Sequence, residues 1–185
     1  MEKNLTQGSI LKNIISFSLP FLFSYFLQTL YGMADLFIAG QYNGAEVITA
    51  ISVGSQIMHM LTVIIVGLAA GGSIFISQAV GAKDEKTASK VTGNTITLFF
   101  ILSVFSTFIL LISTKRIISL VSTPKESIEQ TFGYLQICFT GIPFVIFYNV
   151  IASMYRGIGD SKTPMIFVII ACTLNIILDF IFVGL

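Results

Sequence analysis

Long runs without a charged residue are the feature that most constrains how this chain can fold. The run from Asn13 to Ala34 has no charged side chain over 22 positions, and the run from Val47 to Ala82 has none over 36. About 20 consecutive apolar residues are enough for a helix to cross a bilayer. Only 10% of the 185 residues are charged, against roughly 25% in soluble domains. The sequence therefore predicts an all-α integral membrane protein.

Five hydrophobic segments, separated by polar connections, predict five transmembrane helices. All connections but one are short, so consecutive helices are expected to be antiparallel neighbours. No internal repeat or soluble domain is visible between residues 1 and 185. The approximate helix ranges are 14–40, 48–80, 91–114, 130–155 and 164–185.

The distribution of Lys and Arg predicts how the chain is oriented. If the N-terminus is cytoplasmic, seven basic residues lie on the cytoplasmic side, Lys3 among them, and three lie outside. Cytoplasmic loops carry the excess of Lys and Arg, so we expect a multi-pass plasma-membrane protein with its N-terminus inside. The net charge of +1 gives no case for a nucleic-acid partner. An odd number of helices that stops abruptly at Leu185 is typical of the N-terminal part of a larger protein.

Asp35 is the residue that a membrane helix tolerates least. A lone carboxylate at the centre of a spanning helix costs about 2.5–3.5 kcal/mol or more, so such a residue suggests a function. Gln28, Tyr31 and Asp35 follow Ser24 at spacings of 4, 3 and 4, which places all four on one helix face. Pro20, earlier in the same segment, removes a backbone hydrogen bond and bends a helix, either as a static kink or as a hinge.

A second acid is expected at a similar depth. Asn175 and Asp179 are four residues apart and therefore share a helix face. Asp179 lies about 22 Å beyond Pro164 at 1.5 Å per residue, in the half of the membrane that Asp35 also reaches. Two carboxylates and an amide offer oxygen ligands to Na⁺, and the same carboxylates can take protons as a coupled pair. Exchange of either cation would suit an antiporter, and the residues leave the choice between them open.

Two further polar features lie within the predicted helices. His59, the single histidine, is either a packed residue or part of a transport path. Asn149 belongs to a polar patch in the fourth helix with Tyr148 and Ser153, and it is expected to line a cavity. No organic cofactor is expected.

The segment Gly157-Ile158-Gly159-Asp160 offers a different interpretation. It spells GxGD, which occurs in some intramembrane aspartyl proteases with two membrane-embedded aspartates. Asp160 is predicted on the cytoplasmic side, whereas Asp35 is near the outer side. Two acids on opposite faces cannot share one water, so the protease remains a remote alternative.

Taken in order, these motifs resemble the multidrug and toxic compound extrusion (MATE) family, and in particular its prokaryotic branch that includes DNA-damage-inducible protein F. Each motif is weak alone, but their order and spacing are specific. The matching segments are Pro20 with Gln28-x-x-Tyr31-x-x-x-Asp35 and Gly40, Ser77-Gln78-x-x-Gly81-Ala82, Arg156-Gly157-x-Gly159-Asp160-x-Lys162-Thr163-Pro164, and Asn175-x-x-x-Asp179.

The resemblance implies twelve helices in two pseudo-symmetric six-helix lobes, of which this chain would be the first five helices of the N-lobe, with the C-terminal lobe as its partner. It implies that Asp35, Asn175 and Asp179 form a cation site, that Gln28 and Tyr31 line the adjoining cavity, and that helix one bends at Pro20. The implied activity is not enzymatic: export of cationic, amphipathic compounds in exchange for Na⁺ or H⁺. A flippase for lipids or polysaccharide precursors is the alternative, and it would be expected to place cationic residues in the cavity.

Overall fold

The computed structural model describes residues 8–184, so Lys3 and Leu185 lie outside the described residues. Every regular element within that range is helical. The elements are α1 (Ile10–Tyr42), α2 (Ala45–Gly81), α3 (Glu85–Leu120), the short 3₁₀ helix η1 (Lys125–Ser127), α4 (Ile128–Thr140), α5 (Ile142–Gly157) and α6 (Lys162–Gly184).

Four helices, α1, α2, α3 and α6, are each long and apolar enough to cross a membrane. The segments Lys125–Thr140 and Ile142–Gly157 are long and apolar enough only when they are taken together as a fifth candidate span, and they are bent by 49° at their junction. The structure therefore differs from the single helix predicted over 130–155. Gly141 separates the two helices, and Pro143 lies in the first turn of α5, where its missing N–H costs no helical hydrogen bond.

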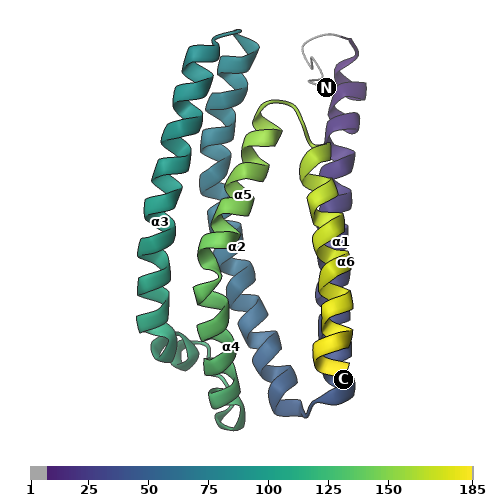
Figure 1. Ribbon diagram of the computed structural model, residues 1–185, viewed down its shortest axis with the longest axis vertical. Coiled ribbons are helices and arrows are strands. Elements are labelled where there is room, and N and C mark those ends of the chain that lie inside the picture. Colours follow the sequence, from purple (N-terminus) through teal and green to yellow (C-terminus); the bar gives the residue numbers. More distant parts are fainter. Residues whose placement is uncertain (1–7, 185) are drawn as a thin grey trace.

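The helices form two groups with different interiors (Figure 1). We call α2, α3, α4 and α5 the block, and α1 with α6 the pair. The four block helices contact one another extensively, and α1 contacts α6 more than it contacts α2. One connected cluster of buried apolar residues lies entirely in the block, namely Ile57, Ile65, Ala69, Phe99, Ile118, Leu135, Phe139, Ile142, Ile146 and Val150. The pair buries fewer apolar side chains, among them Ile38, Ala39, Val168 and Cys172.

Chain order does not decide which helices are neighbours. α6 packs mainly against α1 and makes few contacts with α5, although a short connection joins α5 to α6. The expected pairing of consecutive helices is therefore wrong at this point. α1 and α6 run in the same direction (Figure 1), so a parallel pair stands beside the block.

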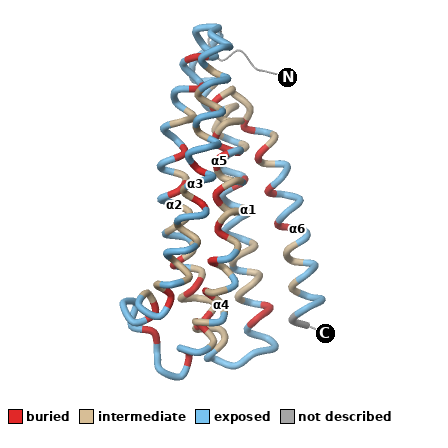
Figure 2. The backbone as a smooth tube through the Cα atoms, turned by 60° about the vertical axis from the view of Figure 1, so that its left-hand side comes forward, coloured by how far each residue is buried: buried red, intermediate tan, exposed pale blue. Residues whose placement is uncertain are grey.

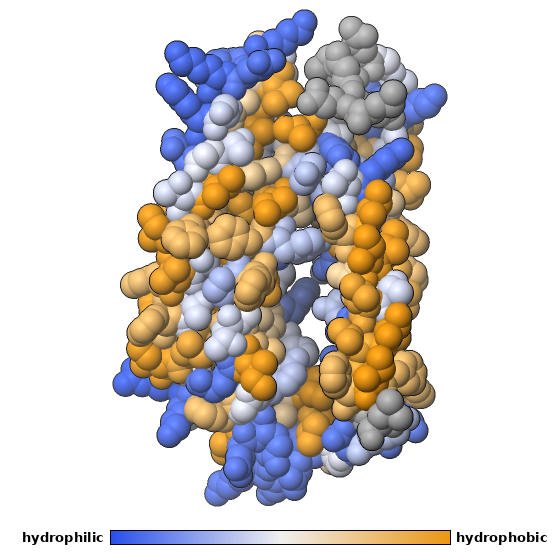
Figure 3. All heavy atoms as spheres, viewed as in Figure 1, coloured by the Kyte–Doolittle hydropathy of each residue, from blue (hydrophilic) through white to orange (hydrophobic). Residues whose placement is uncertain are grey.

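The surface is that of a membrane-spanning bundle. Buried residues face the inside of the bundle, and the outer faces are largely exposed (Figure 2). Apolar side chains cover the middle of the molecule and hydrophilic ones gather at its two ends (Figure 3). The α2–α3 and α5–α6 connections lie at the same end as the start of α1, and the α1–α2 and α3–α4 connections lie at the opposite end (Figure 1).

Candidate functional site

The pair brings together the two acids that the sequence singled out. Asp35 of α1 and Asp179 of α6 are both half-buried and close enough to interact electrostatically. Tyr31, one turn before Asp35 on the same helix, interacts with both. Because α1 and α6 are parallel and adjacent, acids that lie at similar positions along them meet across one helix contact.

Two oxygen atoms at this point have no partner. Asn175 Oδ1 and Asp179 Oδ2 are buried, and neither accepts a hydrogen bond from the described residues. Buried polar atoms are nearly always hydrogen-bonded, and an exception calls for an explanation such as an ion. Acceptor oxygens left without a donor suit a cation, so the residues present fit Na⁺ or a proton.

The donor set also limits which cation fits. Residues 8–184 contain no group of three or more His, Cys, Asp and Glu side chains that could hold a metal ion. Two carboxylates and one amide supply oxygen ligands without nitrogen or sulfur, which disfavours zinc or copper.

A cavity of about 160 Å³ lies between α1, α2, α5 and the start of α6. Gln28 and Asn149, both expected to line a cavity, line this one. Tyr31 is not among its lining residues and belongs with the acids instead. Asn149 is held in place, because its Nδ2 donates to the Val145 carbonyl of its own helix at 2.8 Å. The space-filling view shows a hollow between α6 and the block at this side of the molecule (Figure 3).

The sequence did not place three other residues in this cavity. Arg156 was assigned to a cytoplasmic connection, but it occupies the last turn of α5 and lines the cavity with Tyr148 and His59. Its guanidinium carbon lies 5.4 Å from the centre of the Phe21 ring of α1. The signal was present in the spacing, because Asn149 and Arg156 are seven residues apart and share a helix face.

α1 continues through Pro20 as one helix from Ile10 to Tyr42. The Ser24 hydroxyl, one turn later, donates to the Pro20 carbonyl at 2.8 Å. A serine that bonds back to its own helix next to a proline is compatible with a bend in the helix. The role of Pro20 as a hinge remains a prediction.

The GxGD segment has a structural explanation at the α5–α6 connection. A Cβ atom at Gly157 would lie 2.9 Å from the Ser73 carbonyl oxygen, so α5 approaches α2 closely only with glycine there. Gly159 has φ of +87°, a left-handed conformation that favours glycine. Asp160 accepts hydrogen bonds from the backbone N–H groups of Lys162 and Thr163 at 2.9 and 3.0 Å.

The ionisation of Asp160 follows from these bonds. Burial opposes its negative charge, but the hydrogen bonds from Thr163 and Lys162 outweigh burial and hold the pKa of Asp160 below its usual value. Asp160 thus stabilises the start of α6 at the end of the molecule opposite to Asp35.

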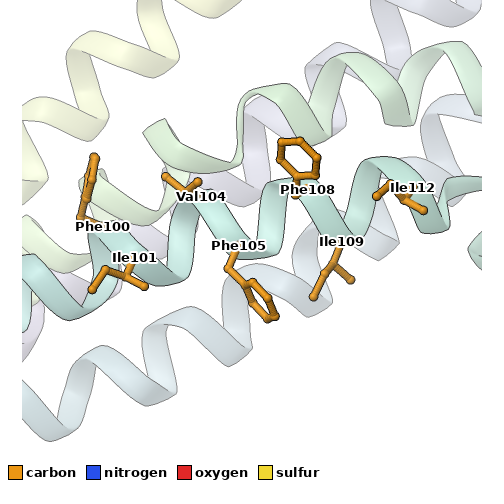
Figure 4. Close-up of a pocket in the computed structure, with 7 residues that line it drawn as sticks. All are labelled: Phe100, Ile101, Val104, Phe105, Phe108, Ile109 and Ile112. Carbon is orange, nitrogen blue, oxygen red and sulfur yellow. The ribbon is translucent and has the colours of Figure 1, made fainter.

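A larger hollow of about 570 Å³ runs along α3 and lies away from these polar groups. Its lining is entirely apolar and comes from α3 alone (Figure 4). In a membrane such a surface faces lipid, so it offers no polar chemistry to a site. The lining residues are Phe100, Ile101, Val104, Phe105, Phe108, Ile109 and Ile112.

Comparison with known proteins agrees with this architecture. A relative from Bacillus subtilis (strain 168), named "Probable multidrug resistance protein YoeA", is 33% identical over 94% of this chain and 37% of its own length. "Multidrug export protein MepA" of Staphylococcus haemolyticus (strain JCSC1435) is 31% identical over 94% of this chain and 38% of its own. A solved structure titled "Crystal structure of MATE in the bent conformation" superposes with a TM-score of 0.87 at 28% identity, over 95% of this chain and 39% of that one.

The chain therefore spans about two fifths of the length of these relatives. The model of the MatE family matches residues 20–181, which include α2 to α5, most of α1 and α6, and the polar residues of the pair. The branch within the family remains a prediction. The sequence motifs, the helical fold and this match agree: the chain belongs to the MatE family of multidrug and toxic compound extrusion transporters.

Proposed function

We propose that this chain is the greater part of the N-terminal lobe of a multidrug antiporter, which exports cationic, amphipathic compounds in exchange for Na⁺ or H⁺. The observation that carries the proposal is the pair of orphaned oxygens on α6, Asn175 Oδ1 and Asp179 Oδ2, beside Asp35 of α1. The names of the relatives, which describe multidrug resistance and export proteins, support the export of drugs.

The mechanism requires that one site exists in two states. A cation bound between α1 and α6 neutralises the repulsion between Asp35 and Asp179, and so it favours close packing of the pair. When the cation leaves, the two carboxylates repel each other and favour a rearrangement of α1, with Pro20 as the point of bending. A ligand shifts such an equilibrium only through its different affinity for the two states, and these carboxylates supply that difference.

The location and partners follow from the same proposal. The protein would reside in the plasma membrane with its N-terminus in the cytoplasm, and a C-terminal lobe would complete the transport path. The α2–α3 and α5–α6 connections lie at one end of the bundle (Figure 1) and carry Lys83, Lys86 and Lys162 at or near them. This supports the proposed orientation because cytoplasmic loops carry the excess of Lys and Arg.

The proposal is tested by efflux of ethidium from cells or vesicles that contain the full-length protein, driven separately by a Na⁺ gradient and by a pH gradient. We expect one of the gradients to drive efflux in the wild type and not in the variant Asp179→Asn. Asp84→Asn is the matched control, because Asp84 is an exposed acid in the α2–α3 connection and asparagine also caps helices well. Gradient-driven efflux that survives in Asp179→Asn would show that the site is wrongly assigned.

A further inference from the structure

Arg156 and Phe21 form a contact that joins the block to the pair. The guanidinium carbon of Arg156, in the last turn of α5, lies 5.4 Å from the centre of the Phe21 ring of α1. A cation within about 6 Å of a ring centre is attracted to the face of the ring. No acid among residues 8–184 interacts with Arg156, so no carboxylate in the described part of the chain competes with the ring for the guanidinium.

The contact crosses a gap rather than a packed helix interface. The backbone of α1 approaches α6 and α2 but not α5, and both Arg156 and Phe21 line the cavity between these helices. The side chain of Phe21 is 42% exposed and lies outside the buried apolar cluster of the block. Loss of the contact would therefore free α1 without opening a hole in the packing of the block.

The place of Phe21 on α1 gives this contact leverage over the candidate cation site. Phe21 directly follows Pro20, where the helix lacks one backbone hydrogen bond and bends most easily. Asp35 lies 14 residues beyond Phe21. This is about 21 Å along the helix axis, so a change of about 10° in the bend would move Asp35 sideways by about 4 Å. Whatever holds α1 at Phe21 therefore affects where Asp35 lies.

From this geometry we propose that Arg156 is a positioning residue, which clamps α1 to the block beside its point of bending and so sets the balance between two arrangements of α1. The clamped arrangement is the one described above, with Phe21 against the guanidinium. In the unclamped arrangement, α1 has bent at Pro20 and Phe21 has moved away from Arg156. The inference rests on the proposed function, because that function requires two arrangements of α1. Arg156 acts through Phe21, without contact to the transported cation.

Fluorinated phenylalanines at position 21 test the clamp, because each fluorine weakens the negative face of the ring while its shape changes little. In the full-length protein, Phe21 is replaced in turn by mono-, di- and trifluorophenylalanine. Spin labels replace the exposed residues Met33 of α1 and Ile112 of α3, after the native cysteines have been removed. Pulsed electron paramagnetic resonance then reports the two arrangements as two distances between the labels.

We expect the ratio of the clamped to the unclamped arrangement to fall with each added fluorine, by about threefold to thirtyfold over the series. Arg156→Gln should lower the ratio at once and remove its dependence on fluorine. Arg156→Lys should keep part of that dependence, because lysine retains a positive charge without the planar guanidinium.

The matched control is the same fluorine series at Phe108 of α3. This ring is 68% exposed in the apolar hollow along α3, away from Arg156, so fluorine there should leave the ratio unchanged. If Arg156→Gln fails to fold, the two fluorine series in the wild-type background still decide, since they change neither the charge nor the size of any helix contact by much.

Three results would overturn the proposal: a single distance between the labels in every variant, a ratio that does not respond to fluorine at position 21, or an equal response to fluorine in Arg156→Gln. Efflux of ethidium under each gradient is measured in parallel. If a gradient drives efflux but fluorine leaves the ratio unchanged, the clamp is wrong and the antiporter stands. If neither gradient drives efflux, the proposed function fails, and the ratio of the two arrangements still decides on the clamp.

Discussion

The pair and the block are both made of apolar membrane helices, yet they differ in what they bury. The block contains a connected cluster of ten buried apolar residues. The pair places two acids and an amide at its helix contact, and two of their oxygens have no hydrogen-bond partner among the described residues. The block is stabilised by packing, and the pair carries polar groups that packing alone does not explain. The difference suggests that the block determines the stability of the fold and the pair determines cation coupling. Substitutions in the block should therefore change stability, and substitutions in the pair should change the cation dependence of efflux.

An orphaned polar atom in each region gives the sharpest contrast. Asn175 Oδ1 in the pair and Thr107 Oγ1 in the block are both buried, and neither has a hydrogen-bond partner in the part of the chain that the structure describes. We expect Asn175→Ala to raise the concentration of driving cation needed for half-maximal efflux by about tenfold or more, because a ligand to a charged group is lost. Its thermal stability should stay close to that of the wild type.

Thr107→Val is the control for this prediction. It removes an unpaired hydroxyl from the block at constant shape, which is neutral or stabilising. The cation concentration needed for half-maximal efflux by Thr107→Val should match that of the wild type. Equal effects of the two substitutions on cation dependence would remove the distinction between the pair and the block.

Leu135 tests the packing of the block. It is fully buried at 0% exposure in α4, and we expect Leu135→Ala to destabilise the protein by about 2–5 kcal/mol because it leaves a cavity. Leu174 of α6 is 54% exposed, so Leu174→Ala should change stability little. Thermal unfolding in detergent measures both, and a larger loss from Leu174→Ala would contradict the assignment of stability to the block.

Gly54 tests a closer contact within the block. A Cβ atom there would overlap the ring of Tyr134, whose hydroxyl lies 3.2 Å from Ser55 Oγ. We expect Gly54→Ala to cost about 1–3 kcal/mol through overpacking. Gly67→Ala on the same helix meets no atom within 4 Å and should be neutral. The double variant with Tyr134→Leu should recover part of the loss in the same unfolding assay.

Asp160 should give a smaller, pH-dependent effect at the start of α6. Its pKa is lower in the folded protein than the usual value, so its charge stabilises the fold above about pH 4, and this contribution is lost as the pH falls toward the folded-state pKa. We expect Asp160→Ala to cost about 1 kcal/mol at pH 7, as for a lost helix cap. The difference between Asp160→Ala and the wild type should shrink in acid, and a difference that is constant with pH would argue against this origin.

Much of the fold could be predicted from the sequence. The hydrocarbon of a membrane requires long uncharged helices, and the corresponding uncharged runs are easily recognised in the sequence. The depth of Asp35 and Asp179 also follows from counting residues along straight helices. The break at Gly141 was missed, although Gly141 and Pro143 marked it within one apolar segment. The contact between α1 and α6 was not predictable from connection lengths, since packing between distant segments decides it.

The candidate site was also predicted in part, because the membrane makes polar residues rare within the helices. Gln28, Asn149, Asn175 and the two acids were predicted because polar residues are conspicuous in apolar runs, and their role in cation binding stays a prediction. Arg156 was assigned to a loop, since it follows the end of an uncharged segment and precedes a polar one. Only its packing against Phe21 of another helix places it in the cavity.

In the proposed mechanism, Asp35 and Asp179 act as one cation site between α1 and α6. The most direct test is a double-mutant cycle on gradient-driven efflux with Asp35→Asn, Asp179→Asn and both together. Groups that act as a unit are strongly non-additive, so each single variant should abolish coupled efflux, and the double variant should be no worse than either. Substantial coupled efflux in either single variant, or losses that add, would contradict the account.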